Sequence, residues 1–429
     1  MSRLTRRQFS GRVAGTALAT AALGGIGRSA WAQATTLRWF WWGNPERNKR
    51  TYAVVDLYDE KHPDITVEAE TIGWDDYWAK MATQTSGRNM ADVVQMDYRY
   101  LFEYARRQQL EPLDDYVGDI LDLSHFDDSF LDSGRVGGQL YAVPWTSNSI
   151  ACFYDQEKLA ELGVSMPDHT WTYDDLRTLA SEVKQQVGEG YWGVADKGHW
   201  EPALECFLRQ RGKALYTEDG SLGYDEEDVA DYFGLWQSMR DEGLVPTPEI
   251  TVRDTASLPD MPLTTGAAAI DFAHSNQLVA LQALNPHQLG MNMYPNAPGG
   301  QPGQYLKPSM LISVSATSPV KEEAVKFTSF LASDLEAAAI LRVERGVPGD
   351  GRVREFLIEE VDPLEKKMID YLAIVTDNVS PLPPPPPKGA GEIEQMLTRM
   401  YPELTFERLS VTDAASQFYS TAESILRRS

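Results

Sequence analysis

The sequence predicts an α/β fold in which parallel strands form a sheet covered by helices. Strand-like segments span residues 36–42, 65–72 and 91–97, and a helix-like segment follows each of them. Because parallel neighbours need a crossover connection, usually a helix, this alternation favours a parallel sheet. The chain of 429 residues is long enough for two or three structural units.

The first strand-like segment is rich in aromatic residues and ends on two neighbouring tryptophans, Trp41 and Trp42. Asn44 and Pro45 then mark a helix start, because asparagine is a good cap and proline at the first helical position loses no hydrogen bond. Residues 65–72 alternate apolar and polar side chains, as a half-buried strand does.

The next elements continue the same alternation. Asp75 is expected to cap a helix at 76–86, and the apolar segment 91–97 is typical of a buried strand. A helix is expected from about 99 to 108, and these elements together predict the first α/β unit.

A different order begins at residue 137. A strand, a break at Pro144, a second strand and a helix are expected within 137–163. The C-terminal third is mostly helical, and its proline run at 383–387 predicts a stiff extended connector. Further strands are expected at 266–276 and 305–317, and further helices at 171–186, 200–212, 225–242 and 319–333.

The first 32 residues predict a cleaved export signal rather than a part of the fold. The stretch "TRRQF" resembles a twin-arginine signal, a run of apolar and small residues spans 13–27, and "AWA" (30–32) is a small-x-small cleavage site. Export by the general route stays open as an alternative. Since no cysteine lies near the cleavage site, we expect a periplasmic protein without a lipid anchor.

Composition excludes several classes of partner. A net charge of −24 argues against nucleic acid and anionic membrane surfaces, and no apolar run is long enough for a membrane span. Cys152 and Cys206 leave two alternatives open, one disulfide or two buried thiols. The six histidines are scattered, so neither a metal nor a cofactor is expected.

Several segments resemble one known family. The stretch "GGQLYAVPWTSNSIACFYDQEKLAELG" (137–163) is similar to the lobe-crossing segment of type 1 extracellular solute-binding proteins, which serve sugar ABC importers. "GAAAI", "KPSMLISVSATSPVKEEAVKFTSFLAS" and "LRVERGVPG" resemble three further segments in the family's order. "LRWFWWG", "IGWDDYWAKMATQ" and "ADVVQMDYRYLFEY" are similar to members that handle plant cell-wall sugars, including oligogalacturonide binders.

The resemblance implies a two-lobe periplasmic binding protein of type II, with a ligand cleft between the lobes and a hinge of crossing strands. Carried onto this chain, the first lobe is 34–143 plus 305–345, and the second is 144–304 plus 346–429. It also implies capture of a carbohydrate, delivery to the permease subunits of an ABC transporter, and a monomer. The crossings are expected at "VPW" (143–145) and near Tyr305.

A pyranose needs flat aromatic platforms for its C–H faces and fixed polar groups for its hydroxyls. In open α/β sheets ligands bind at the carboxyl ends of strands. In this sequence aromatic and polar residues cluster at the ends of the predicted strands. We expect Trp41 or Trp42 to face the cleft, while Trp39 and Phe40 are structural. The candidates of the first lobe are Trp41, Trp42, Asn44, Glu46, Arg47, Trp74, Asp75, Asp97, Tyr98 and Arg99. Those of the second lobe and the crossings are Trp145, Thr146, Ser147, Trp200, His274, Ser275, Lys307 and Arg345.

The charge of the sugar stays open. Arg47, Arg99, Lys307 and Arg345 could pair with a uronate or another anion, because an arginine fork suits a carboxylate. The negative net charge opposes an anionic ligand, so a neutral saccharide is the alternative. An exported glycosidase or lyase is the second class of function, but no catalytic motif supports an enzyme.

Overall fold

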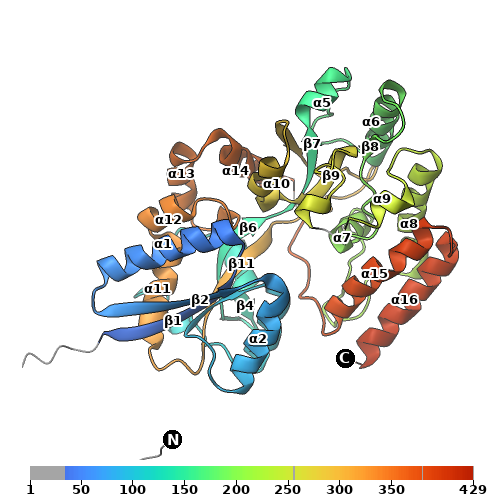
Figure 1. The fold of residues 1–429 in the computed structure, drawn as a ribbon. Helices are drawn as coiled ribbons and strands as arrows, with labels where there is room; N and C mark the ends of the chain where they lie inside the picture. Colours follow the sequence, from blue (N-terminus) through green and yellow to red (C-terminus); the bar gives the residue numbers. More distant parts are fainter. Residues whose placement is uncertain (1–33, 255–256, 379, 429) are drawn as a thin grey trace, which may run out of the picture.

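The computed structural model describes residues 34–254, 257–378 and 380–428, except for the side chains of Asp75 and Ser129. The predicted export signal, 1–32, lies outside the described residues. Two sheets with separate helical coverings lie side by side, and two strands run between them (Figure 1). Within the described ranges, no helix combines the length and the apolar character that crossing a membrane requires.

The first sheet has six described strands in the order β12-β6-β11-β3-β1-β2. β1 pairs in parallel with β2 and β3, as the sequence predicts, whereas β11 runs antiparallel to both β3 and β6. The strands are β1 (Thr35–Trp42), β2 (Ile65–Ile72), β3 (Val93–Met96), β6 (Val143–Asn148), β11 (Lys307–Val314) and β12 (Val347–Pro348). This sheet therefore combines N-terminal strands with strands from much later in the chain.

Helices on both faces of the first sheet bury its apolar side chains. The Asn44 side chain accepts a hydrogen bond from the Arg47 amide and Pro45 opens the helix, as predicted. Gly73 occupies the cap position of the second helix, which begins at Trp74, so the prediction that Asp75 caps it is wrong. These helices are α1 (Pro45–Lys61), α2 (Trp74–Ser86), α3 (Tyr98–Arg106), α4 (Asp128–Leu131), α11 (Lys321–Ser333) and α12 (Leu335–Leu341).

The second sheet has four described strands in the order β10-β7-β9-β8. They are β7 (Ile150–Asp155), β8 (Trp192–Val194), β9 (Ala268–His274) and β10 (Leu289–Asn292), and a small hairpin is formed by β4 (Arg135–Val136) and β5 (Gln139–Leu140). β7 runs antiparallel to β9 and β10, while β8 and β9 are parallel. The helices around this sheet are α5 (Gln156–Glu161), α6 (Tyr173–Gln186), α7 (Glu201–Arg209), α8 (Glu226–Asp241), α9 (Pro248–Thr251), α10 (Leu278–Leu284), α13 (Gly351–Glu360), α14 (Pro363–Thr376), α15 (Ala390–Thr405) and α16 (Val411–Arg428).

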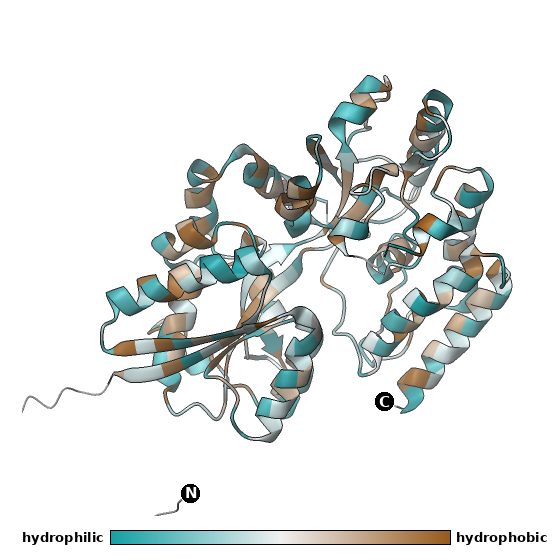
Figure 2. Ribbon diagram, in the orientation of Figure 1, coloured by the Kyte–Doolittle hydropathy of each residue, from teal (hydrophilic) through white to brown (hydrophobic). Residues whose placement is uncertain are grey.

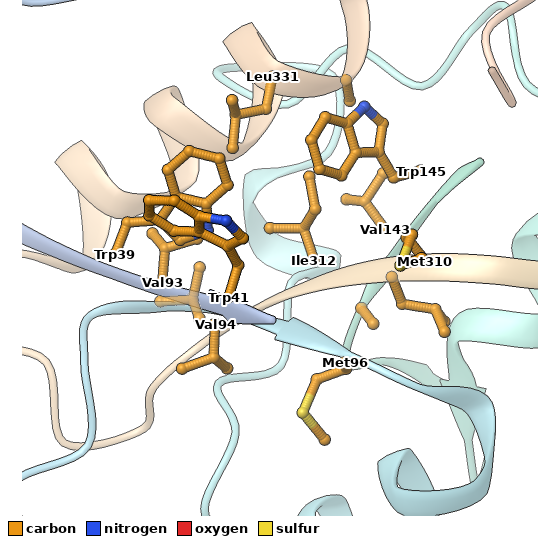
Figure 3. Close-up of a cluster of buried hydrophobic side chains, with 14 of the residues drawn as sticks. Trp39, Trp41, Val93, Val94, Met96, Val143, Trp145, Met310, Ile312 and Leu331 are labelled. Atoms are coloured by element: carbon orange, nitrogen blue, oxygen red, sulfur yellow. The ribbon is translucent and has the colours of Figure 1, made fainter. Parts of the chain in front are cut away.

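Each sheet has its own apolar core. In the first, Trp39 and Trp41 pack with ring centroids 4.7 Å apart among residues of β3, β6, β11 and α11 (Figure 3). Two further clusters lie on the second sheet, one with α15 and α16 and one with α10, α13 and α14. Hydrophilic and hydrophobic residues alternate along α15 and α16, as in helices with one buried face (Figure 2).

The chain crosses between the sheets at two adjacent points. β6 ends at Asn148 and β7 begins at Ile150, so Ser149 alone separates a strand of the first sheet from one of the second. The return crossing passes Tyr305 just before β11 begins. β6 and β11 therefore form the central link in Figure 1, and the two crossings lie next to each other.

Candidate ligand-binding cavity

A cavity of about 250 Å³ lies where the two sheets face each other. This is slightly below the range of about 300–1,000 Å³ for drug-sized ligand pockets, and it suits a ligand of one or two rings. Its walls come from the strand ends and helix starts of the first sheet, from α7 and β9 on the second sheet, and from the crossings. The proline run supplies a further wall through Pro383, Pro384 and Pro386, next to Ala390 and Glu394 of α15.

Two tryptophans from opposite sides line the cavity. Trp74 opens α2 on the first sheet, and 42% of its surface is exposed. Its ring packs edge-on against Trp42, with centroids 5.0 Å apart, so an inner tryptophan supports an outer one. Trp200, at the cap position of α7, lies 5.5 Å from the His274 ring, also edge-on. The cavity thus has an aromatic surface on each side.

Arg99 carries an ion-pair network across the cavity. Its guanidinium group lies 3.5 Å from Glu201 Oε2 of α7 and also pairs with Glu394 of α15. Arg99 is the second residue of α3, where the Asp97 side chain accepts a hydrogen bond from its amide at 2.9 Å. A cation of the first sheet therefore contacts two carboxylates of helices that cover the second.

The carboxyl groups of α7 titrate abnormally. Burial raises the pKa of Glu201 to about 8, helped by the charges of Glu394 and Glu205 and opposed by Arg99. Burial also raises the pKa of Glu205, and this rise is opposed first by the charge of Arg209, one turn later in α7, and then by the hydrogen bond of 2.9 Å that its carboxylate accepts from the Tyr305 hydroxyl. Glu201 therefore holds a proton at neutral pH when no ligand is present.

A histidine and a lysine complete the polar lining. Burial lowers the pKa of His274 to about 3, and the charges of Lys307 and Arg99 act in the same direction. The imidazole is therefore neutral, with one donor and one acceptor nitrogen. The Lys307 ammonium group forms no hydrogen bond or ion pair with a described residue. Among those residues no group of three or more His, Cys, Asp or Glu side chains could hold a metal ion.

Some of the residues predicted from the sequence meet at this cavity. The predicted residues that line it are Trp74, Asp97, Tyr98, Arg99, Trp200, His274 and Lys307. Trp74 follows the end of β2, and Asp97, Tyr98 and Arg99 follow the end of β3, each within three residues, so the strand-end argument located these four. Asp75 lies in the first turn of α2, and its side chain is outside the described part of the structure.

The neighbouring tryptophans of β1 lie beneath the surface. Trp41 is fully buried, and its indole N–H donates to Asn48 Oδ1 at 3.0 Å. Trp42 is 6% exposed and supports Trp74 from below. Neither of them lines the cavity. Trp39 and Phe40 are fully buried in the same core.

The polar side chains at the start of α1 hydrogen-bond or pair with other protein side chains. Asn44 Nδ2 donates to Glu344 Oε1 at 3.0 Å, and Arg47 Nε donates to Glu344 Oε2 at 2.7 Å. Glu46 pairs with Arg50 one turn later in α1. Asn44 and Arg47 thereby connect the start of α1 to the segment after α12. None of Asn44, Glu46 and Arg47 lines the cavity.

The predicted residues of the crossings are buried within the sheets. The Arg345 guanidinium group lies 4.9 Å above the Trp145 ring and donates to Gln95 and Thr51. Burial lowers the Arg345 pKa to about 9, and the Arg47 charge acts in the same direction. The Thr146 and Ser147 hydroxyls bond within the strand region, and Ser275 Oγ accepts from the Ser149 amide at 3.2 Å.

Sequence reasoning missed several lining residues. Glu205 lies one turn after Glu201 in α7, a spacing that could have suggested a paired carboxylate face. Glu394 gave no such signal, because it comes from a helix almost 300 residues after Arg99. Cys206 also lines the cavity, and both Cys206 and Cys152 are buried free thiols. The structure therefore selects the second of the two alternatives for the cysteines.

Two lobes, joined by adjacent crossings around a cavity that both line, define a two-lobe binding protein. Residues 53–349 match the family model described as bacterial extracellular solute-binding protein. The match covers more than half of the chain, so the chain belongs to this family, as its resemblance predicted. The family consists of binding proteins, in agreement with the prediction of a binder rather than an enzyme.

Solved structures share the fold. An extracellular solute-binding protein of family 1 from Alicyclobacillus acidocaldarius is 28% identical, with a TM-score of 0.76. A periplasmic solute-binding protein from Pectobacterium atrosepticum is 23% identical with a TM-score of 0.82. An oligogalacturonide-binding protein from Yersinia enterocolitica, solved with saturated digalacturonic acid, is 21% identical with a TM-score of 0.80. Each comparison covers 92% of this chain and 99% of the other.

Curated relatives match over shorter regions. A binding protein of Brucella abortus is 27% identical over 193 residues, which cover 44% of this chain and 46% of that protein. The lactose-binding protein of Rhizobium radiobacter is 25% identical over 227 residues, or 52% of this chain and 50% of that protein. The chain thus spans about half the length of these relatives.

Proposed function

We propose that this protein captures a saccharide in the cavity between its lobes and delivers it to the permease subunits of an ABC transporter. The observation that carries the proposal is the placement of Trp74 and Trp200 on opposite walls, with carboxylate, hydroxyl and amine groups between them. The names of the lactose-binding and oligogalacturonide-binding relatives support a sugar as the ligand class.

The lining matches the two kinds of surface on a pyranose. The exposed Trp74 ring offers a flat apolar face to sugar C–H groups. Asp97, Glu205 and Lys307 offer acceptors and donors to ring hydroxyls, and hydrogen bonds to charged groups are stronger than those between neutral ones. In this proposal, Trp41, Arg47 and Arg345 stabilise the lobes rather than contact the ligand.

Ligand binding would close the lobes because the contacts come from both sides. A ligand shifts an open–closed equilibrium only by its differential affinity for the two states. A saccharide that contacts Trp74 and Trp200 together binds the closed state more tightly, because in an open cleft it could contact only one of the two rings. The sequence-based boundary at 143/144 falls inside β6, and we place the transition at Ser149, where the chain passes between sheets. The sequence-based boundary at 345/346 precedes β12, which pairs with β6 in the first sheet, so we place that transition after Pro348. The boundary at 304/305 is kept as proposed.

The predicted twin-arginine-like signal supports export, and we propose a periplasmic monomer without a lipid anchor. Isothermal titration calorimetry of the mature chain, from residue 33, against neutral, acidic and basic saccharides tests the central proposal. We expect heat and a thermal shift with at least one saccharide, and chromatography should return that ligand unchanged. A panel without any binding, or a cleaved ligand, would overturn the proposal.

A further inference from the structure

The cavity lining is short of positive charge. It holds four carboxyl groups, those of Asp97, Glu201, Glu205 and Glu394, and two cationic groups, those of Arg99 and Lys307. Its formal charge is therefore −2 when every group is ionised, and −1 when Glu201 holds its proton. Because the walls are protein rather than water, charges interact there more strongly than on an open surface. A ligand that enters must be compatible with this excess of negative charge.

One of the two cations already has carboxylate partners. Arg99 already pairs with Glu201 and Glu394 from two different helices. The Lys307 ammonium group has no direct partner among the described residues, but its charge lowers the pKa of both Glu201 and Glu205. Arg99 is thus held by carboxylates, whereas Lys307 acts on Glu201 and Glu205 through its charge alone. A ligand carboxylate at Lys307 would have to lie beside those two glutamates.

Two of the carboxylates lie together on one helix face. Glu201 and Glu205 are separated by one turn of α7, so both side chains project to the same side and both line the cavity. The Tyr305 hydroxyl donates to Glu205 Oε2, and Arg99 approaches Glu201 Oε2. Oε1 of each glutamate has no donor among the described residues. Two acceptor oxygens therefore remain for a ligand.

We propose that the preferred ligand is an amino saccharide, a sugar with a protonated amine, and that Glu201 and Glu205 receive its ammonium group. This inference rests on the proposed function and specifies the ligand class of the same cavity. An ammonium group supplies three donors and one positive charge, which match the two free acceptor oxygens and the charge deficit. A uronate would add a fifth carboxylate beside Glu201 and Glu205.

The raised pKa of Glu201 agrees with this assignment. Without a ligand its carboxyl group holds a proton at neutral pH, because burial and the neighbouring carboxylates disfavour the ion. A ligand ammonium group beside it would favour the ionised form, so binding would release a proton. A neutral hydroxyl would not produce that release.

The test compares matched sugars that differ at one substituent. Calorimetry would use glucosamine, glucose and glucuronate, the corresponding galactose series, and the dimers of each, at about pH 6.5, where such an amine is protonated. In whichever of the glucose and galactose series binds, we expect the amino sugar to bind at least about tenfold more tightly than its neutral counterpart. The uronate should bind more weakly than both.

Variants separate the charge of the cavity from its shape. Glu205→Gln and Glu201→Gln keep the side-chain size and should each reduce the preference for the amine while neutral-sugar binding persists. Glu182→Gln, on the exposed face of α6, makes the same chemical change away from the cavity and should leave the preference intact. Titrations in buffers of different ionisation enthalpy should detect proton release with the wild type and less with Glu201→Gln.

The outcomes distinguish the two proposals. If the uronate binds most tightly, or if amine and neutral sugars bind equally, the amine assignment is wrong while saccharide capture stands. A preference for the amine that survives both Glu201→Gln and Glu205→Gln would also overturn the assignment. If no saccharide of any charge binds, both proposals fail.

Discussion

The Ser149 hydroxyl donates a hydrogen bond of 2.9 Å to the Tyr305 carbonyl oxygen, which ties one lobe crossing to the other. Ser149 is the single residue between β6 and β7, and Tyr305 lies just before β11. The Ser149 backbone also pairs with Ser275 on the second sheet. The two connections are therefore coupled at the position of the proposed hinge.

Replacement of Ser149 by alanine should change the balance between open and closed states. The change removes the bond to Tyr305 and a longer one of 3.3 Å that the hydroxyl accepts from Gln304 Nε2. It should cost about 1–2 kcal/mol of stability and uncouple the crossings. We expect a larger radius of gyration without ligand, measured by small-angle X-ray scattering, and weaker saccharide binding. Ser313→Ala removes a similar 2.9 Å bond, from Ser313 Oγ to the Tyr141 carbonyl, inside the first sheet. It should lower stability without a change in radius, and equal radii for both variants would contradict a hinge role.

The exposed tryptophan of the cavity should affect binding more than stability. Trp74→Ala removes a ring that is 42% exposed, so the loss of buried area is moderate. If the ring stacks on a sugar, its truncation should cost about 2 kcal/mol of binding free energy, or about thirtyfold in Kd. Calorimetry with the bound saccharide measures this change.

The buried Trp41 should affect stability more than binding. Trp41→Ala empties a fully buried site and removes the indole donor from Asn48 Oδ1, which keeps the Thr71 hydroxyl as a donor. We expect a loss of about 3–5 kcal/mol in urea unfolding, with Kd of the folded protein nearly unchanged. A strong loss of affinity in Trp41→Ala at full stability would show that Trp41 contacts the ligand.

Glu201 should make the ligand-free protein less stable as the pH rises. The folded state keeps its proton up to about pH 8, whereas the unfolded chain releases it near the ordinary value of 4.5. The folded state therefore binds more protons between these values, and stability falls as pH increases through that window. Thermal unfolding from pH 5 to 8 should show a smaller decline for Glu201→Gln than for the wild type. Glu182→Gln should retain the wild-type slope, and identical slopes for all three proteins would contradict the shifted pKa.

The ion pair of Arg47 and Glu344 should be structural. Their side chains are 9% and 11% exposed, so Glu344→Ala leaves a buried guanidinium group without its carboxylate. We expect a loss of about 3–5 kcal/mol in urea unfolding and unchanged saccharide affinity. Glu46→Ala removes a half-exposed partner of Arg50 in the same helix and should cost less than about 1 kcal/mol. Weaker saccharide binding by Glu344→Ala would instead place Arg47 in the binding site.

The order of the N-terminal elements could be predicted because it depends on local patterns. Alternating side chains, the Asn44-Pro45 helix start and the apolar β3 segment each determine structure within a few residues. The antiparallel insertion of β11 between β3 and β6 depends on contacts more than 150 residues apart along the chain. No local pattern encodes that pairing.

Local sequence position also explains which site residues could be predicted and which could not. Trp74 and Asp97 were found because both follow strands whose ends meet at one sheet edge. Arg47 and Arg345 have equally suitable positions in the sequence, but Glu344, Gln95 and Thr51 bind them in the fold. A sequence displays the charge of a side chain but not the partner that neutralises it.

The proline wall restricts which atoms a ligand can present on that side. Proline has no backbone N–H, so Pro383, Pro384 and Pro386 can offer carbonyl oxygens but no amide donors. The Pro383 carbonyl already accepts from the Tyr98 hydroxyl at 3.2 Å, which shows that this wall acts as an acceptor. A molecule rich in O–H and N–H groups can donate hydrogen bonds to this wall. A molecule that presents only acceptor atoms to it forms no hydrogen bond there.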